Sequence, residues 1–545
     1  MTASLLSRYE RVLGHLLPRA AVWLTALLSA WLVLTGPLVV GALLAAVAVV
    51  ATVWWRLALP GADRHLVART VLTMALAIAI ARTSGWSWPL LGCLALLIGA
   101  LMIEPTAGHA TRPALRARSL PGLRLSWVDH LPEPVFLATS CGVILLAAGA
   151  LGDASTFLLL TAVITLAGLC LAGTQLLRTR RHLAEKAIRA ALVDLAPSWA
   201  LYFSGTAAAD YQIRMWLPYL ERTGERGVLL IRDPRFLAAA ARLQLPVVLA
   251  RSLESLEYVA VPSMRAFFYV NNDAKNAHGV RFAGITHVHL GHGDSDKPAS
   301  YSATFGMFDR IFVAGRAAVD RFARNGVVVP EEKFVLVGRP QVEGIQVRDG
   351  TGRSEHPTVL YAPTWRGGLE DSLFGSLRYG ERIVSALLRA GATVWFRPHP
   401  YSARDAESRV QIGRIDAMLA ADSSRPHAGS AETSVHTVVE CMNASDAMVT
   451  DVSSVASDYL YSNKPFAITD TGVGADIAAA FPLARAAVLL HVDGELDAPI
   501  AELLGSDPAR AARAELRSYY LGDWPPQGYA DVFVAAARAA MTGEY

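Results

Sequence analysis

The chain has 545 residues, of which 53% are hydrophobic, and its mean hydropathy is +0.33. It is too long for one ordinary domain and too apolar for a purely soluble protein, so we expect a membrane part. The formal net charge is only +3, so charge alone indicates neither a nucleic-acid partner nor an acidic substrate. The cysteines at 93, 141, 170 and 441 form no CxxC pair, which fits a reducing compartment.

Long apolar runs, with Arg69 as their only charged residue, occupy the first third of the chain. They lie at about 20–35, 38–55, 66–81, 88–103, 134–151 and 155–177. Several approach the roughly 20 residues that cross a bilayer core, so we predict a multi-span transmembrane domain of about six helices over residues 1–177. The segment Thr35–Pro37 predicts a tight break between the first two helices.

Arginines indicate how these spans are oriented. They cluster before the first run, between the second and third, between the fourth and fifth, and in the basic segment 178–197. The positive-inside rule therefore predicts a multi-pass protein of the cell membrane with both termini and all later residues in the cytoplasm. Segment 178–197 is interpreted as a juxtamembrane linker. No charge inside a span is predicted to mark a pathway, and Glu104 is expected at the interface.

From about residue 198, short β-rich runs alternate with helical stretches, which is typical of parallel α/β units. We predict one Rossmann-like domain over 198–342 and a second over 357–545, with the polar segment Gln341–Pro357 as a linker between them. The predicted strands are WALYFSG, GVLLIRD, PVVLA, AFFYVN, THVHL, RIFVAG and KFVLVG in the first domain, and TVLYAPTW, TVWFRPHP, DAMVTD and PFAITD in the second.

Four polar segments follow predicted strands, where ligands bind in sheets of this kind. They are HLGHGDSDK (289–297), YAPTWRG (361–367), FRPHP (396–400) and TDVSSVASDYL (450–460). In the last, Asp451 ends a strand and Ser453 and Ser454 open a helix, whose free N–H groups favour a phosphate, although plain helix capping has the same pattern.

Two further strand ends carry groups suited to phosphate. In FRPHP, Arg397 is able to grip a phosphate through two nitrogens, and His399 is able to donate a proton near pH 7. YAPTWRG adds Thr364 and Arg366 at another strand end. Each segment is a weak signal alone, so the prediction depends on their combination.

The segment ITHVHLGHGDSDKP permits several readings. A zinc site on His287, His289 and His292 is conceivable, but this spacing across a glycine matches no zinc pattern, and no metal site is predicted. A serine nucleophile at Ser295 is disfavoured because none of the fourteen histidines has aspartate three residues before it. We favour His292 as a base, with a structural His292 as the alternative.

With these segments in this order, residues 267–465 resemble the CDP-glycerol glycerophosphotransferase family, which makes teichoic-acid-type polymers. The matching residues are HGDSDK (292–297), VGRPQ (337–341), YAPTWRG, RPHP and SDAMVTDVSSVASDYLYSNKP (445–465). The resemblance implies a GT-B fold. Two departures stand out: DSD at 294–296 replaces the usual continuation after His-Gly, and Gln341 stands where many relatives have arginine.

The resemblance also implies roles for the matching residues. His292 and His399 would be catalytic, the first acting on the acceptor hydroxyl and the second on the donor phosphate. Donor-binding residues would be Thr364, Arg366, Arg397, Asp451, Ser453 and Ser454, and acceptor-side or supporting residues Gly293, Asp294, Lys297 and Asp458. No cofactor is expected beyond the CDP-alditol co-substrate, although a divalent metal is not excluded.

These expectations predict a membrane-anchored transferase of glycerol phosphate, or another polyol phosphate, from CDP-glycerol or a related CDP-alditol to a lipid-linked glycan or polymer, with release of CMP. Two alternatives stay open. One is a GT-B glycosyltransferase that uses a nucleotide sugar, and the other is a membrane scaffold or transporter with a degenerate transferase domain.

Overall fold

The computed structural model describes residues 2–58, 63–111, 113–205, 209–240, 242–297, 300–348, 354–365, 374–472 and 477–544. The chain divides into two compact units. The first comprises Met1–Arg116 and Gly122–Ala191, and the second comprises Ala117–Pro121 and Leu192–Tyr545.

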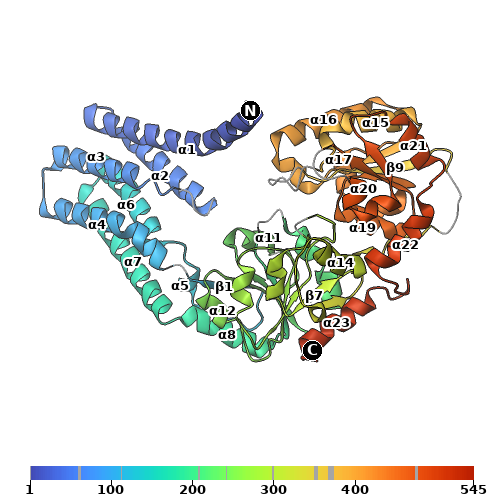
Figure 1. Cartoon of the computed structure of the whole chain (residues 1–545). Coiled ribbons are helices and arrows are strands. Elements are labelled where there is room, and N and C mark those ends of the chain that lie inside the picture. Colours follow the sequence, from blue (N-terminus) through green and yellow to red (C-terminus); the bar gives the residue numbers. More distant parts are fainter. Residues whose placement is uncertain are drawn as a thin grey trace. The chain divides into compact units, whose positions relative to one another are not determined.

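The first unit is helical, with the helices drawn in blue to cyan in Figure 1. Its long helices are α1 (Thr2–Thr35), α2 (Leu38–Ala58), α3 (Leu66–Ser84), α4 (Trp88–Ala110), α6 (Pro134–Leu151) and α7 (Ala154–Arg180). A short α5 (Trp127–His130) precedes α6, and α8 (Leu183–Leu195) follows α7 within the segment predicted as a linker. The predicted break between the first two helices is present, because α1 ends at Thr35 and α2 begins at Leu38.

Among the described residues, five helices are long and apolar enough to cross a membrane, namely α2, α3, α4, α6 and α7. The first predicted span falls on α1, whose apolar part, Arg19–Thr35, is shorter. A count of six is therefore not confirmed. Small side chains such as Ala45, Ala77 and Ala147 are buried between the helices, so the helices pack closely.

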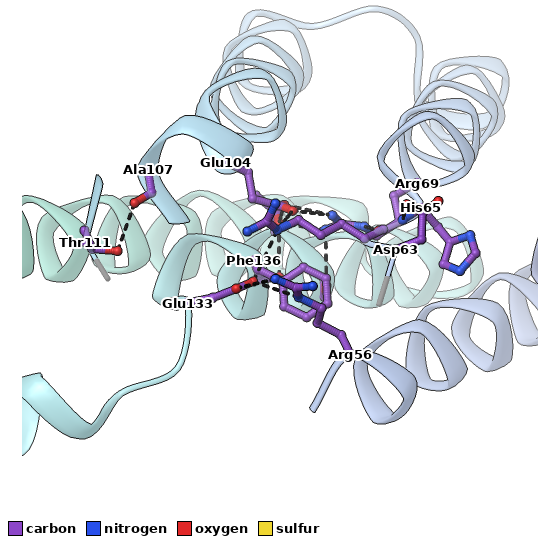
Figure 2. A network of polar contacts seen from close by, with 12 residues as sticks. Arg56, Asp63, His65, Arg69, Glu104, Ala107, Thr111, Glu133 and Phe136 are labelled. Atoms are coloured by element: carbon purple, nitrogen blue, oxygen red, sulfur yellow. Dashed lines mark hydrogen bonds and ion pairs between the residues drawn. The ribbon is translucent and has the colours of Figure 1, made fainter. Parts of the chain in front are cut away.

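One residue of this unit has a partner that was not predicted. Glu104, expected at the membrane interface, is buried within the protein, with 1% of its side chain exposed, and it pairs with the equally buried Arg69 at 2.7 Å. Figure 2 shows the two charges meeting between α3 and α4. The sequence pattern hid this pair because each charge stands alone in its own apolar run and only packing brings them together.

The second unit contains two sheets, in which β2–β8 and β9–β13 pair in parallel as far as the described residues extend. The larger has the strand order β1-β4-β3-β2-β5-β6-β7-β8 and the smaller β10-β9-β11-β12-β13. The larger sheet is built from β1 (Leu115–Arg118), β2 (Trp199–Phe203), β3 (Gly227–Ile231), β4 (Val247–Ala250), β5 (Ala266–Tyr269), β6 (Thr286–His289), β7 (Arg310–Val313) and β8 (Phe334–Leu336). The smaller is built from β9 (Thr358–Ala362), β10 (Thr393–Phe396), β11 (Ala447–Thr450), β12 (Phe466–Asp470) and β13 (Val488–His491).

All strands predicted in the two series are present, whereas β1 and β13 were missed. Residues 210–224 contain two short helices, α9 (Tyr211–Arg214) and α10 (Leu217–Glu221), and not one continuous helix. Pro218 explains the split, because its ring and missing N–H are tolerated only in the first turn of a helix.

Helices cover both faces of the smaller sheet. One face buries α15 (Gly380–Arg389), α16 (Ala406–Ala421) and α21 (Asp497–Leu504), and the other buries α18 (Val438–Ala444), α19 (Ser454–Tyr459) and α22 (Arg510–Leu521). The remaining helices of this unit are α11 (Leu237–Ala240), α12 (Glu254–Glu257), α13 (Asn276–Gly279), α14 (Arg316–Arg324), α17 (Ser430–Ser434), α20 (Ile477–Ala480) and α23 (Asp531–Thr542).

The last helix does not stay with the smaller sheet. Phe533, Ala537 and Met541 of α23 are buried in the core of the larger sheet, beside Trp216 and Phe312. The stretch predicted as the second domain, 357–545, thus returns to the first at its end. The helix was missed because its alanine-rich sequence does not reveal which core it joins.

Candidate active site

The strand orders place two reversal points in this unit. In the larger sheet the order reverses between β2 and β5, and in the smaller between β9 and β11. Ligands bind outside the carboxyl ends of strands at such points. The four polar segments follow β6, β9, β10 and β11, so all leave their sheets at carboxyl ends.

The His292 loop, residues 290–297, begins with a turn at Gly291, whose φ of +66° favours glycine. Trp216 Nε1 donates a hydrogen bond to the Gly291 carbonyl at 2.7 Å, which fixes the start of the loop. His292 hydrogen-bonds to the backbone carbonyl of Val270, and burial together with the charge of Arg339 lowers its pKa to about 4. The ring is therefore neutral at pH 7. Because one nitrogen donates to Val270, the other keeps a lone pair that is able to accept a proton.

His287 and His289 are strand residues with structural partners. His287 bonds Tyr269 Oη at 2.9 Å and the Phe282 carbonyl at 3.1 Å. His289 Nε2 contacts Asn272 Oδ1 at 2.9 Å, and burial lowers the pKa of His289 to about 3. Of the three histidines in this segment, His292 alone lies on a loop.

The unusual DSD segment has an arginine partner that the sequence did not reveal. Arg321, on α14, bonds Asp294 at 2.6 Å and Asp296 at 2.9 Å, and its side chain is only 2% exposed. Tyr520, on α22, donates to the other Asp296 oxygen at 2.5 Å. Asp296 thus ties the loop to two helices. Asp294 Oδ2 is buried and has no partner among the described residues, so an acceptor-side role for Asp294 stays a prediction.

His399 follows β10 and caps a 3₁₀ turn. Its Nδ1 accepts a hydrogen bond from the Tyr401 backbone N–H at 3.1 Å. Burial, with the nearby charge of Lys297 next in size, lowers the pKa of His399 to about 4. In the neutral ring the proton therefore lies on Nε2, which makes His399 a hydrogen-bond donor.

Tyr211 lies between the two loops. Its ring centroid is 6.3 Å from that of His292 and 6.2 Å from that of His399, edge-on to both. Tyr401 lies 6.0 Å from Tyr211, and Trp365 lies 6.3 Å from His399. The two predicted catalytic histidines are thus brought to one place beside an aromatic wall. No local pattern pointed to Tyr211, since it lies eighty-one residues before His292.

The two halves of the unit also touch through the predicted binding residues. A Cβ added at Gly293 would come within 2.8 Å of Ser454 Oγ, so the loop approaches α19 closely only because residue 293 is glycine. Lys297 Nζ donates to Thr364 Oγ1 at 3.3 Å. Ser453 is the N-cap of α19 and forms no side-chain cap hydrogen bond, while its Oγ lies 3.4 Å from that of Thr450.

Asp451 has a different environment from these residues. It is fully buried, and its carboxylate accepts from the backbone N–H of Thr364 at 2.6 Å, the N–H of Ser376 at 3.2 Å and the Thr469 hydroxyl at 2.5 Å. Burial raises its pKa. The carboxylate therefore holds the loop after β9 in place, and this positioning accounts for its contacts without a ligand.

Two arginines, Arg397 and Arg366, were predicted to bind phosphate. Arg397 donates from Nη1 to the Thr433 carbonyl and lies 3.7 Å from Cys441 Sγ, so part of its guanidinium is engaged by α17 and α18. Arg366 lies outside the described residues. Gln341 Nε2 donates a hydrogen bond to the Met215 carbonyl at 2.9 Å, which connects the segment after β8 to the end of α9.

A buried ion pair supports the His292 loop from the other half of the unit. Arg339 bonds Asp458 at 2.9 Å, with side-chain exposures of 4% and 13%. The Arg339 backbone N–H donates to Tyr529 Oη at 3.1 Å. Asp458 was predicted to have a supporting role, but Arg339 was missed, although it stands in the GRP segment. Within the described residues, no three His, Cys, Asp or Glu side chains are grouped to hold a metal ion.

Two parallel Rossmann-type sheets, with polar loops converging from their carboxyl ends, are the architecture of GT-B transferases. Residues 335–471 match the model of a family described as CDP-Glycerol:Poly(glycerophosphate) glycerophosphotransferase, which confirms the resemblance predicted from the sequence. This segment contains Arg339, Thr364, His399 and Asp451, whereas His292 precedes it. The match supports a glycerophosphotransferase enzyme.

Solved structures are similar at low identity. The wall teichoic acid polymerase TagF has 14% identity and a TM-score of 0.41, covering 67% of this chain and 95% of that one. A TagF variant soaked with CDPG has 13% identity and a TM-score of 0.40, covering 66% and 94%. A UDP-N-acetylglucosamine 2-epimerase has 13% identity and a TM-score of 0.41, covering 64% and 96%. At these TM-scores the likeness does not bear on substrate or residue roles. No curated protein sequence matches the chain.

Proposed function

We propose that the chain is a membrane-anchored transferase that moves glycerol phosphate, or another polyol phosphate, from a CDP-alditol to a lipid-linked glycan or polymer acceptor. The family match over 335–471 supports the donor class. The apolar helices α2, α3, α4, α6 and α7 support membrane anchoring, and the placement of arginines supports a cytoplasmic catalytic unit.

In this proposal His292 is the general base. The acceptor hydroxyl gives its proton to the free ring nitrogen of His292 while its oxygen attacks the β-phosphorus of the donor. A new P–O bond forms, the bond from the β-phosphorus to the bridging oxygen breaks, and CMP leaves with the electron pair. The neutral state of His292, caused by burial and Arg339, keeps the base unprotonated at pH 7.

In this proposal His399 is the hydrogen-bond donor to the phosphate. Its Nε2–H donates to a phosphate oxygen of the donor, and Lys297, close to Thr364, adds positive charge on the same side. Ser453 and Ser454 offer hydroxyl groups at the start of α19. Arg397 and Arg366 are further proposed phosphate ligands. These protein groups would meet the charge of the donor without a resident metal.

The observation that carries this proposal is the meeting of His292 and His399 at the Tyr211 ring. One histidine keeps a lone pair and the other keeps a proton, which is the division of labour that phosphoryl transfer to a hydroxyl needs.

The proposal is tested with membranes containing the full chain. CDP-glycerol, CDP-ribitol and nucleotide sugars are supplied in parallel, and CMP release and lipid-attached product are measured. We expect CMP release from a CDP-alditol, lost in His292→Ala and His399→Ala but kept in His356→Ala, an exposed histidine before β9. Sugar transfer without CMP release would instead identify a glycosyltransferase, and no nucleotide binding at all would favour the scaffold or transporter.

A further inference from the structure

The helical unit contains a cluster of charges that the proposed catalytic reaction does not use. We define the arginine cluster as Arg56, Arg64, Arg69, Glu104 and Glu133, which come from α2, the start of α3, α4 and the start of α6 (Figure 2). Charged side chains within apolar helices are costly and mark functional sites unless they are fully paired. A functional role therefore depends on whether the positive and negative charges of this cluster are equal in number.

One arginine of the cluster is fully satisfied. Arg69 donates twice to Glu104, at 2.7 and 2.8 Å, and to Thr139 and Ser140 at 2.9 and 3.2 Å. Its Nε donates to the Arg64 carbonyl at 2.9 Å, and its side chain is 1% exposed. This pair is a structural core that joins α3, α4 and α6.

The rest of the cluster has more positive than negative charge. Glu133 is shared by Arg56 at 2.6 Å and Arg64 at 3.2 Å. Among the described residues, three guanidinium groups thus face two carboxylates, and the neighbouring pair Arg19–Asp63 leaves this balance unchanged. An unbalanced charge in a largely buried position is unfavourable, so an anion is needed to complete the cluster.

Arg64 is the group that an incoming anion would reach. It is the most exposed arginine of the cluster, at 18%, compared with 7% for Arg56 and 1% for Arg69. Its Nε lies 3.2 Å from Glu133 and 3.5 Å from Glu104, and neither Nη atom has a hydrogen-bond partner among the described residues. Gly108 makes room for this guanidinium, since a Cβ there would lie 2.6 Å from Arg64 Nη2.

The position of the cluster indicates where that anion comes from. It lies where α2 and α4 end and where α3 and α6 begin, at one end of helices long enough to cross a bilayer. At that depth lipid headgroups are the most concentrated anions, and arginine grips a phosphate through two parallel hydrogen bonds. We propose that Arg64, supported by Arg56, binds the phosphate of an anionic lipid headgroup. This site does not depend on the proposed catalytic function.

The test uses the purified full chain in nanodiscs of phosphatidylcholine alone or with added phosphatidylglycerol. We expect the anionic lipid to raise the melting temperature, and Arg64→Gln to weaken lipid binding roughly tenfold, the effect of losing a charge-assisted hydrogen bond. Arg82→Gln is the matched control, because Arg82 is exposed at the opposite end of α3. It should respond to the lipid like the unaltered chain.

A second variant separates binding from folding. Glu133→Gln raises the excess positive charge without removing an arginine, so the lipid should bind more tightly. Equal lipid response in the unaltered chain and Arg64→Gln would overturn the proposal. An equal rise in melting temperature with inorganic phosphate in phosphatidylcholine discs would also overturn it, because the site would then be for a small anion.

Discussion

The His292 loop and the His399 loop hold the same side chain in the same protonation state but leave different ring atoms available. Both rings are neutral at pH 7, since each pKa is lowered to about 4, mainly by burial. They differ in the backbone group that binds each ring. The protonated nitrogen of His292 is engaged by a backbone carbonyl, so its lone pair stays available. In His399 the lone pair is engaged by a backbone N–H, so its ring N–H stays available.

This difference teaches that the backbone partner, and not the pKa, selects acceptor or donor character in a neutral histidine. The charges around the two rings also differ. Besides burial, Arg339 lowers the pKa of His292, and Lys297, at the end of the His292 loop, lowers that of His399. His292 also lowers the pKa of His399, so the two rings are electrostatically coupled.

The largest expected effect is on the His292 side. His292→Ala should lower kcat by roughly 10²–10⁴-fold, the range for loss of a general base, with little change in KM for the CDP-alditol. His292→Gln preserves a side-chain N–H for the Val270 carbonyl but supplies no base, so it should be equally impaired. The measurement is the rate of CMP release. Near-normal turnover in the glutamine variant would show that the ring only fills space.

Breaking the ion pair behind His292 should have the next largest effect. Arg339→Met leaves Asp458 buried and unpaired, which should cost about 3–5 kcal/mol of folding free energy. The measurement is urea unfolding of the full chain in detergent. Arg414→Met removes an exposed pair with Glu381 and should cost about 0–1 kcal/mol. The double variant Arg339→Met with Asp458→Asn should recover much of the loss, and failure to do so would indicate that the cost comes from packing.

A smaller effect is expected on the His399 side. His399→Ala removes one hydrogen bond to the donor phosphate, so kcat/KM for the CDP-alditol should fall roughly tenfold to a hundredfold, within the range for a lost charge-assisted bond. The larger part should appear in KM. If kcat alone fell, by as much as in His292→Ala, the division between base and donor would be wrong.

The sequence was informative about strands and about the loops that end them. Both strand series and the loops of His292, His399 and Thr364 could be placed, because period-2 patterns and strand ends are local features. Arg321 and Asp296 lie twenty-five residues apart and Asp296 and Tyr520 lie 224 apart, so no local pattern joins them. The DSD segment therefore looked like an acceptor-side motif, although Asp296 ties the loop to α14 and α22.

The buried pair Arg69–Glu104 shows the same limit in the helical unit. Glu104 follows one predicted span and was expected at its end, whereas Arg69 lies inside another span and was not singled out. The partner is on another helix, 35 residues away, and only the packing of α3 against α4 brings the two charges within 2.7 Å. Likewise, the role of Arg339 depends on a contact with Asp458, 119 residues later.

A change of pH tests the two histidines without any substitution, through kcat/KM and the free energy of unfolding. Because His292 must be unprotonated, kcat/KM should fall only as pH drops through about 4, and not near 6.5 as for an ordinary histidine. Stability should respond earlier. Between pH 6.5 and about 4 the unfolded chain binds protons that folded His292 and His399 do not, so the free energy of unfolding decreases as pH is lowered through this window. Activity per folded molecule and stability should therefore separate between pH 6 and 5 when CMP release and urea unfolding are followed on the same sample. In His399→Ala the fall of kcat/KM at low pH should occur at the same pH, since that ring is not the proposed base. If the fall shifts in this variant, His399 and not His292 would be the base.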